Sequence, residues 1–159
     1  MARVDKIIKF LDLIKHPEGG YFKETYRSEE VYESNQGSRN LSTNIYFLLK
    51  SGQKSAFHRL KSDEFWYYHE GSSLEVFIIH PDGKLEERIL GGDCLSSHEP
   101  QLLLPKGTWF AARCKDESSY TLISCSVAPG FHFDDFELAE RKELQNKFPQ
   151  FHTLIAELT

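Results

Sequence analysis

The sequence has few of the residues that build a disulfide framework, a structural zinc site or a membrane span. Its three cysteines, Cys94, Cys114 and Cys125, are odd in number and none belongs to a CxxC pair, which disfavours both disulfides and thiolate zinc binding. No uninterrupted apolar run approaches the roughly 18 residues of a membrane-spanning helix. The first apolar stretch also lacks a small-residue cleavage site. We therefore expect a soluble cytoplasmic protein.

An excess of basic residues is also missing. The chain has 19 Lys and Arg against 24 Asp and Glu, which gives a net charge of −5, and both signs are spread along the sequence. A protein that binds nucleic acid needs a basic face to neutralise phosphates. Nucleic acid is therefore not an expected partner.

Large apolar side chains, by contrast, are abundant. The 159 residues are 40% apolar and include twelve Phe and seven Tyr, a composition typical of a globular protein and not of a disordered one. A chain of this length can bury roughly 70% of the surface that it exposes when unfolded. With no internal repeat or linker, residues 1–159 are expected to form a single domain.

Helix signals occur near both ends of the chain. Apolar residues at three- and four-residue spacing predict an amphipathic helix at the start: Val4, Ile7, Ile8, Leu11 and Ile14. Near the end, Asp134 and Asp135 precede a stretch with Lys and Arg further on, which predicts a capped helix over residues 136–147.

Between these helices the sequence is typical of short strands. Alternating β-branched and aromatic residues, bounded by Gly and Pro, predict strands over 21–27, 41–50, 55–60, 64–69, 74–80, 84–90, 101–104, 108–113 and 120–127. Residues 28–40 are polar and predict a surface loop or a loose hairpin. Strands this short and this frequent indicate an all-β sandwich or barrel with short helices at its N- and C-termini.

The stretch from Gly52 to Gly71 contains the clearest candidate site. His58 and Glu64 lie six residues apart, and in a strand the side chains of Glu64, Trp66 and Tyr68 share one face. Asp63 then points outward, and a buried Glu64 needs a partner. We expect that partner to be His58.

The spacing of this stretch resembles the first cupin motif, in which two His and a Glu project inward. Gly52, His58, Glu64 and Gly71 match it, and Leu60 occupies the place of the second His. The second cupin motif resembles PKGTWF at residues 105–110, where Phe110 stands in the place of the fourth ligand, a His. Glu99 and Cys114 stand where that motif has its leading Gly and closing Asn.

Four blocks in order extend the resemblance over most of the chain: HPEGGYFKETYRS, FHRLKSDEFWYYHEG, PKGTWFAAR and SVAPGFHFDDFELAER. Together they are similar to the cupin-5 family, stand-alone cupins of unassigned function. The resemblance implies a cupin-type double-stranded β-helix, or jelly-roll barrel, that commonly dimerises. It also implies structural similarity to metal-free sugar-nucleotide epimerases.

A metal centre is not favoured at this site. Catalytic metal sites usually have three protein ligands and an open position, whereas Leu60 and Phe110 supply none. If a divalent metal is bound, His58 and Glu64 are its expected ligands, and the third ligand would come from His98 or His132.

Without a metal, the aromatic residues Trp66, Tyr68 and Phe110 are expected to form either core or a flat wall for a small polar organic ligand. Polar anchors for a phosphate or carboxylate on that ligand are expected among Asn44, Tyr21, Arg27 and Arg113.

These residues support several functional hypotheses. The first is a metal-independent isomerase or epimerase for a sugar or nucleotide sugar, with His58 as the base and Glu64 tuning it. The alternatives are a binding module that uses the same pocket without turnover, a metal-dependent cupin oxygenase, and a dimeric scaffold without a ligand. A homodimer is expected in each case.

Overall fold

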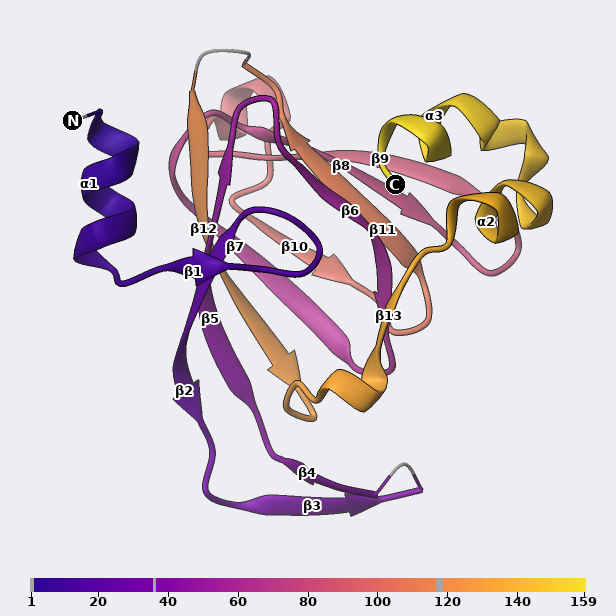
Figure 1. Cartoon of the computed structure of the whole chain (residues 1–159), viewed down its shortest axis with the longest axis horizontal. Helices are drawn as coiled ribbons and strands as arrows, with labels where there is room; N and C mark the ends of the chain where they lie inside the picture. Colours follow the sequence, from indigo (N-terminus) through magenta and orange to yellow (C-terminus); the bar gives the residue numbers. More distant parts are fainter. Residues whose placement is uncertain (1, 36, 117–118) are drawn as a thin grey trace.

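Two β-sheets that pack face to face form the body of the protein, shown in Figure 1 as a computed structural model. The structure describes residues 2–35, 37–116 and 119–159. The first sheet has the strand order β1 (Ile14–Lys15), β2 (Tyr21–Arg27), β5 (Thr43–Lys50), β12 (Tyr120–Ala128), β7 (Asp63–Gly71) and β10 (Gln101–Leu104). The second has the order β13 (Phe136–Leu138), β6 (Lys54–Leu60), β11 (Trp109–Cys114), β8 (Leu74–Ile79) and β9 (Leu85–Leu90).

Helices and a hairpin complete the chain. The helices are α1 (Arg3–Phe10), α2 (Arg141–Lys147) and α3 (His152–Glu157), with short 3₁₀ turns at Cys94–Ser96, Phe133–Asp135 and Pro149–Phe151. Strands β3 (Val31–Ser34) and β4 (Gly37–Asn40) form a separate two-stranded hairpin that extends away from the body in Figure 1. No helix among the described residues is long and apolar enough to cross a membrane.

The main apolar core fills the space between the sheets. Alternate residues of each strand point inward, so both sheets contribute to one buried cluster. From the first sheet come Phe47, Leu49, Trp66, Leu102, Ile123 and Val127; from the second come Leu60, Leu74, Val76, Ile78, Leu90 and Phe110. The outer face of the second sheet packs on α2 and α3, and α1 packs on the outer face of the first.

Most of the strand predictions are confirmed. The strands at 21–27 and 101–104 have the expected bounds, the hairpin over 74–90 is formed, and residues 28–40 contain a hairpin. The closed barrel is not found, because no ladder of hydrogen bonds among the described residues joins the two sheets. Their outermost strands, such as the two-residue β1 and the three-residue β13, are too short to continue the pairing around a closed circuit.

The two predicted helices are shorter than expected. The first ends at Phe10, and Asp12 adopts a positive φ of 54° before the chain enters β1. The second begins only at Arg141, where the Glu140 carboxylate accepts a hydrogen bond from the Glu143 amide. Residues 136–138 instead form an edge strand on β6, because this pairing lets Phe136 pack against the main core.

Candidate functional site

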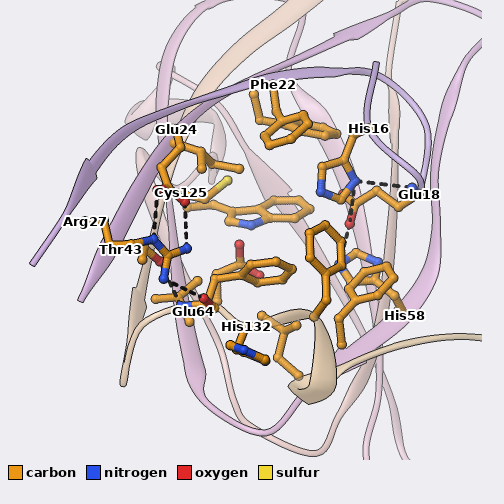
Figure 2. A pocket seen from close by; sticks show the side chains of 18 residues that line it. His16, Glu18, Phe22, Glu24, Arg27, Thr43, His58, Glu64, Cys125 and His132 are labelled. Atoms are coloured by element: carbon orange, nitrogen blue, oxygen red, sulfur yellow. Dashed lines mark hydrogen bonds and ion pairs between the residues drawn. The ribbon is translucent and has the colours of Figure 1, made fainter. Parts of the chain in front are cut away.

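A cavity of about 260 Å³ lies between the sheets, at the end where β2, β5, β6, β7 and β12 approach the 131–136 segment. Six aromatic side chains form most of its walls: Phe22, Phe47, Trp66, Phe131, Phe133 and Phe136. Figure 2 shows two polar groups among these rings: His16, Glu18 and His58 on the right, and Glu24 and Arg27 on the left. The cavity is therefore apolar with a few titratable groups, as in many ligand sites.

The turn at residues 16–20 places Glu18 in the wall of the cavity. Gly19 and Gly20 have positive φ values of 109° and 74°, which glycine adopts at no steric cost. A Cβ at Gly19 would lie 2.1 Å from the Lys54 carbonyl oxygen, so only glycine fits this close approach to β6. The Ala56 amide donates to the Glu18 carbonyl oxygen at 2.9 Å, which fixes the turn against that strand.

The Glu18 carboxylate joins two imidazoles and a hydroxyl inside this wall. Its Oε2 lies 3.0 Å from His58 Nε2 and 3.5 Å from His16 Nδ1. The Ser55 hydroxyl donates to its Oε1 at 2.8 Å. The opposite nitrogen of His58, Nδ1, lies 2.7 Å from the Ala56 carbonyl oxygen. Because both nitrogens of His58 face oxygen acceptors, the ring is held as an imidazolium.

The pKa values of this group follow from these contacts. Burial alone would lower the pKa of His58, but the Glu18 carboxylate outweighs it and raises that pKa. Burial alone would raise the pKa of Glu18, but His58, His16 and Ser55 together lower it. The pKa of His16 is lowered, first by burial. At neutral pH the group is therefore an ion pair between Glu18 and His58 beside a neutral His16.

Glu64 also lies in the cavity wall, but it has a different environment. It is 6% exposed, and its Oε2 has no hydrogen-bond partner among the described residues. Burial raises the pKa of Glu64 to about 7; the His58 charge opposes this shift and the Glu18 charge adds to it. A carboxyl group with this pKa exchanges a proton near neutral pH, which is the property of a general acid or base.

Glu24 and Arg27 form a closed ion pair in the other part of the cavity. Arg27 Nε and Nη2 donate to the two Glu24 carboxylate oxygens at 2.9 and 2.8 Å. Its Nη1 donates to Asn40 Oδ1 and to the Phe131 carbonyl oxygen. Arg27 therefore ties the 131–136 segment to β2, and its donors already have acceptors.

The structure brings together the two central residues predicted from the sequence, but not as a pair. His58 and Glu64 both line the cavity, as do Trp66 and Arg27. The expected partnership between His58 and Glu64 is wrong, because no hydrogen bond or ion pair among the described residues joins them and Glu18 takes the place of Glu64 beside His58.

Three other predicted ligand-binding residues lie outside the cavity lining. Phe110 is buried behind it, with its ring centroid 4.2 Å from that of His58. Tyr68 follows Trp66 on β7, where its hydroxyl donates to the Gly71 carbonyl oxygen. Asn44 lies on the opposite face of β5 from Thr43 and Ile45, which line the cavity. Because side chains alternate along a strand, Asn44 points away from the cavity that its two neighbours line.

Of the remaining candidate ligands and anchors, some line the cavity and others lie elsewhere. His132 lines the cavity, whereas His98 contacts Ser73 elsewhere. Tyr21 packs in the cluster under α1, and Arg113 pairs with Glu75 and Glu157.

Sequence reasoning missed the acid and base residues that come from the first block. His16, Glu18 and Glu24 all line the cavity, yet they lie more than thirty positions before His58 in the chain. One signal was present, since HPEGG combines an acid and an imidazole with the glycines of a tight turn. Only tertiary packing shows that this turn contacts β6.

The cavity does not fit a metal ion of the cupin type. Leu60 presents an apolar side chain to the cavity, and Phe110 packs on His58. His58 Nε2, the nitrogen closest to Glu18, is engaged by that carboxylate. Among residues 2–35, 37–116 and 119–159, no three His, Cys, Asp or Glu side chains are placed to hold one ion. The donors present therefore fall short of the three ligands of a catalytic site.

We accordingly expect the untagged protein to contain no stoichiometric iron, manganese, nickel or zinc by elemental analysis. Treatment with EDTA should leave its thermal midpoint unchanged, because no folding energy comes from a metal. A metal bound at one ion per chain that is lost in Glu64→Ala, but kept in the exposed control Glu137→Ala, would contradict this prediction.

Comparison with known proteins gives consistent matches. The model of a family described as Cupin superfamily (DUF985), Cupin_5, matches residues 5–139. The chain is 33% identical to the uncharacterized protein YML079W of Saccharomyces cerevisiae over 149 residues, 84% of this chain and 74% of that protein. It is similar in structure to protein SO0799 of Shewanella oneidensis, with 42% identity, a TM-score of 0.92 and coverage of 100% and 98% of the two chains.

A more distant structural similarity concerns an enzyme. Oxalate decarboxylase of Bacillus subtilis, which has Mn(II) centres, gives a TM-score of 0.58 at 15% identity. The match covers 93% of this chain and 38% of the decarboxylase chain. At this identity the similarity concerns the fold alone.

Proposed function

The chain belongs to the cupin-5 family of the cupin superfamily, and from this membership and the cavity we propose that it binds a small organic molecule between its sheets and moves a proton on it without a metal. The reaction class is an isomerisation or epimerisation at a carbon next to a carbonyl group. Sugars and nucleotide sugars are the first substrates to test. The jelly-roll arrangement of cupins is the fold that we propose for the two facing sheets.

A single observation carries this proposal: a carboxyl group with a pKa of about 7 lies buried in the cavity wall, and its Oε2 has no hydrogen-bond partner among the described residues. General bases work best when their pKa lies near the operating pH. The ionised Glu64 would take a proton from the carbon next to the carbonyl and return it to the same or a neighbouring carbon. The substrate gains and loses one proton, so no further reactant is needed.

The contacts favour a different division of roles from the one predicted for His58 and Glu64. Both nitrogens of His58 already face oxygen acceptors, so this ring has no free position from which to remove a proton. Its positive charge acts on Glu64 instead and opposes the increase in pKa caused by burial. We therefore assign proton transfer to Glu64, and positioning and charge balance to His58 and Glu18.

Solvent exchange tests the proposal directly. Dihydroxyacetone, D-fructose and pyruvate would each be incubated with the protein in D₂O, and loss of the α-proton signals followed by ¹H NMR. We expect exchange above the uncatalysed rate for at least one compound, increasing with pH through about 7 because the ionised Glu64 is the active form. Glu64→Gln should reduce the rate at least roughly a hundredfold.

The control is Glu137→Gln, since Glu137 is exposed and pairs with Arg59 outside the cavity. Exchange that persists in Glu64→Gln would contradict the role of this residue. Binding seen by thermal shift without any exchange would leave the alternative, a binding module that uses the same cavity without turnover.

We also retain two broader expectations as proposals. The first is a homodimer, supported by the apolar side chains of Phe65 and Leu103 that are exposed on adjacent strands β7 and β10. The second is a cytoplasmic location, supported by three free cysteines, one of them exposed.

A further inference from the structure

We infer that the innermost part of the ligand is a planar ring with a single polar edge, on which a carbonyl oxygen lies next to an N–H or enolic O–H group. This inference rests on the proposed use of the cavity as a ligand site. Among the carbonyl compounds of the proposed function, it favours an unsaturated ring of the cyclic amide or enol type over a polyhydroxylated sugar ring.

Two unsatisfied polar atoms on β7 define that edge. Among the described residues, three buried side-chain N or O atoms have no hydrogen-bond partner, and two of them belong to cavity residues: Glu64 Oε2 and Trp66 Nε1. Glu64 and Trp66 are two positions apart, so their side chains share one face of the strand. Buried polar atoms normally have partners, so a pair without them indicates a group that is supplied by a ligand.

The two atoms have complementary chemistry. The Trp66 indole N–H can only donate, so it needs an acceptor such as a carbonyl oxygen. The ionised Glu64 carboxylate accepts, so it matches a neighbouring N–H or O–H; when protonated it donates, which matches the acceptor nitrogen of the other tautomer. The Trp66 side chain lowers the pKa of Glu64 as a hydrogen-bonding neighbour, so the two groups lie close together, although neither Trp66 Nε1 nor Glu64 Oε2 has a partner in hydrogen-bond geometry among the described residues.

Four of the charged groups that line the cavity are already paired with one another. Glu18 and His58 are paired with each other, and Glu24 is paired with Arg27. A sugar ring presents several hydroxyls, and each one that is buried without a partner weakens binding by roughly five- to 150-fold. One polar edge, by contrast, uses both unsatisfied atoms of β7.

The walls of the cavity also favour a flat ligand. The rings of Phe47 and Trp66 stack with an interplanar angle of 19°, and Phe131, Phe133 and Phe136 meet one another edge to face. The cavity of about 260 Å³ is at or just below the roughly 300 Å³ lower end of ordinary ligand pockets. These dimensions suit a single ring.

The test compares three small probes by ligand-observed NMR titration: 2-pyridone, N-methyl-2-pyridone and D-fructose. 2-Pyridone carries the carbonyl and N–H edge, and methylation removes only the donor to Glu64. We expect wild-type protein to bind 2-pyridone at least about tenfold more tightly than its N-methyl derivative and than D-fructose. Trp66→Phe, which keeps an aromatic ring but removes the N–H, should weaken 2-pyridone binding about tenfold.

A second variant assigns the methylation effect to Glu64. In Glu64→Met the two pyridones should bind with nearly equal affinity, because the acceptor for the N–H is gone. Equal binding of the two pyridones to wild-type protein, or tighter binding of D-fructose that is unaffected by Trp66→Phe, would overturn the inference. The wild-type comparison alone decides the outcome if a variant does not fold.

The result is independent of the exchange experiment. The pyridone pattern without solvent exchange in any substrate would refute proton transfer and keep the ligand class. Solvent exchange in D-fructose without binding of 2-pyridone would refute the ligand class and keep proton transfer.

Discussion

Glu64→Gln is expected to make the protein more stable at pH 8 by about 3 kcal/mol, even though it removes the proposed catalytic group. Burial raises the pKa of Glu64 from 4.5 to about 7. Each pKa unit corresponds to about 1.4 kcal/mol between the two protonation states. Above pH 7 the folded protein must therefore keep a buried carboxylate that water solvates better in the unfolded chain, and a neutral amide avoids this.

The sign of the pH dependence follows from the same shift. A group whose pKa is higher in the folded state binds its proton more tightly there, so Glu64 contributes fully to stability below pH 4.5. That contribution is lost as the pH rises through about 7. The two proteins should thus have similar stability at pH 4.5 and diverge up to pH 8.

Urea denaturation at pH 4.5, 6, 7 and 8 would measure the difference, with equal m-values as the check that compactness is unchanged. Glu87→Gln, at an exposed position on β9, is the matched control and should not show the divergence. A Glu64→Gln protein that is less stable than wild type at pH 8 would mean that the carboxylate has a partner in solution.

A gain of stability on loss of the proposed base would also support a functional reason for Glu64. Proteins often keep a destabilising group where a site needs it, and replacement of that group then stabilises the fold. No packing argument explains a buried carboxylate next to Trp66 and Cys125, because an apolar residue would fill the same space without a desolvation penalty.

The sequence was sufficient for those parts of the fold that depend on local patterns. Alternation correctly placed Glu64 and Trp66 inward and Phe65 outward on β7. The turn residues predicted the hairpin between β8 and β9. The prediction of a helix from residue 136 was wrong at residues 136–138. There, pairing with β6 overrides the helix signal of the preceding acids, as tertiary context commonly does.

Only the part of the site that comes from one stretch of the sequence could be predicted, because the rest depends on tertiary contacts. His58 and Glu64 are close in the chain and lie on consecutive strands, β6 and β7, of the two facing sheets, so their spacing was enough to predict that both belong to one site. Glu18 reaches His58 only because Gly19 lets the turn approach the Lys54 carbonyl, a contact between distant segments. Spacing within one stretch gives no information about such a partner. The sequence therefore predicted Glu64, an acid of the same stretch, as the partner of His58 in place of Glu18.

The ion pair between Glu18 and His58 leads to the second prediction, a large loss of stability when one partner is removed. Glu18→Met removes one member of a buried ion pair and should destabilise the protein by about 3–5 kcal/mol at pH 7, because an uncompensated charge is left behind. His58→Phe should have a similar effect by leaving the Glu18 carboxylate buried without its cation.

The double variant Glu18→Met/His58→Phe should lose less stability than the sum of the single variants, because replacing both charges by apolar side chains removes both desolvation penalties. Urea denaturation of the four proteins at pH 7 gives this interaction energy, and additive losses would show that the two side chains are not coupled.

An NMR titration of the His58 imidazole then distinguishes an ion pair with Glu18 from packing alone. Burial lowers the pKa of His58 and Glu18 makes the largest opposing contribution, so the pKa of His58 should fall in Glu18→Met. With a raised pKa, the contribution of His58 to stability is present in full below pH 6.5 and is lost as the pH rises through its pKa in the folded state. Unfolding of wild type should show this loss, and unfolding of Glu18→Met should not. A His58 resonance that titrates identically in the two proteins would mean that Glu18 only fills space, and the assignment of charge balance to this pair would fail with it.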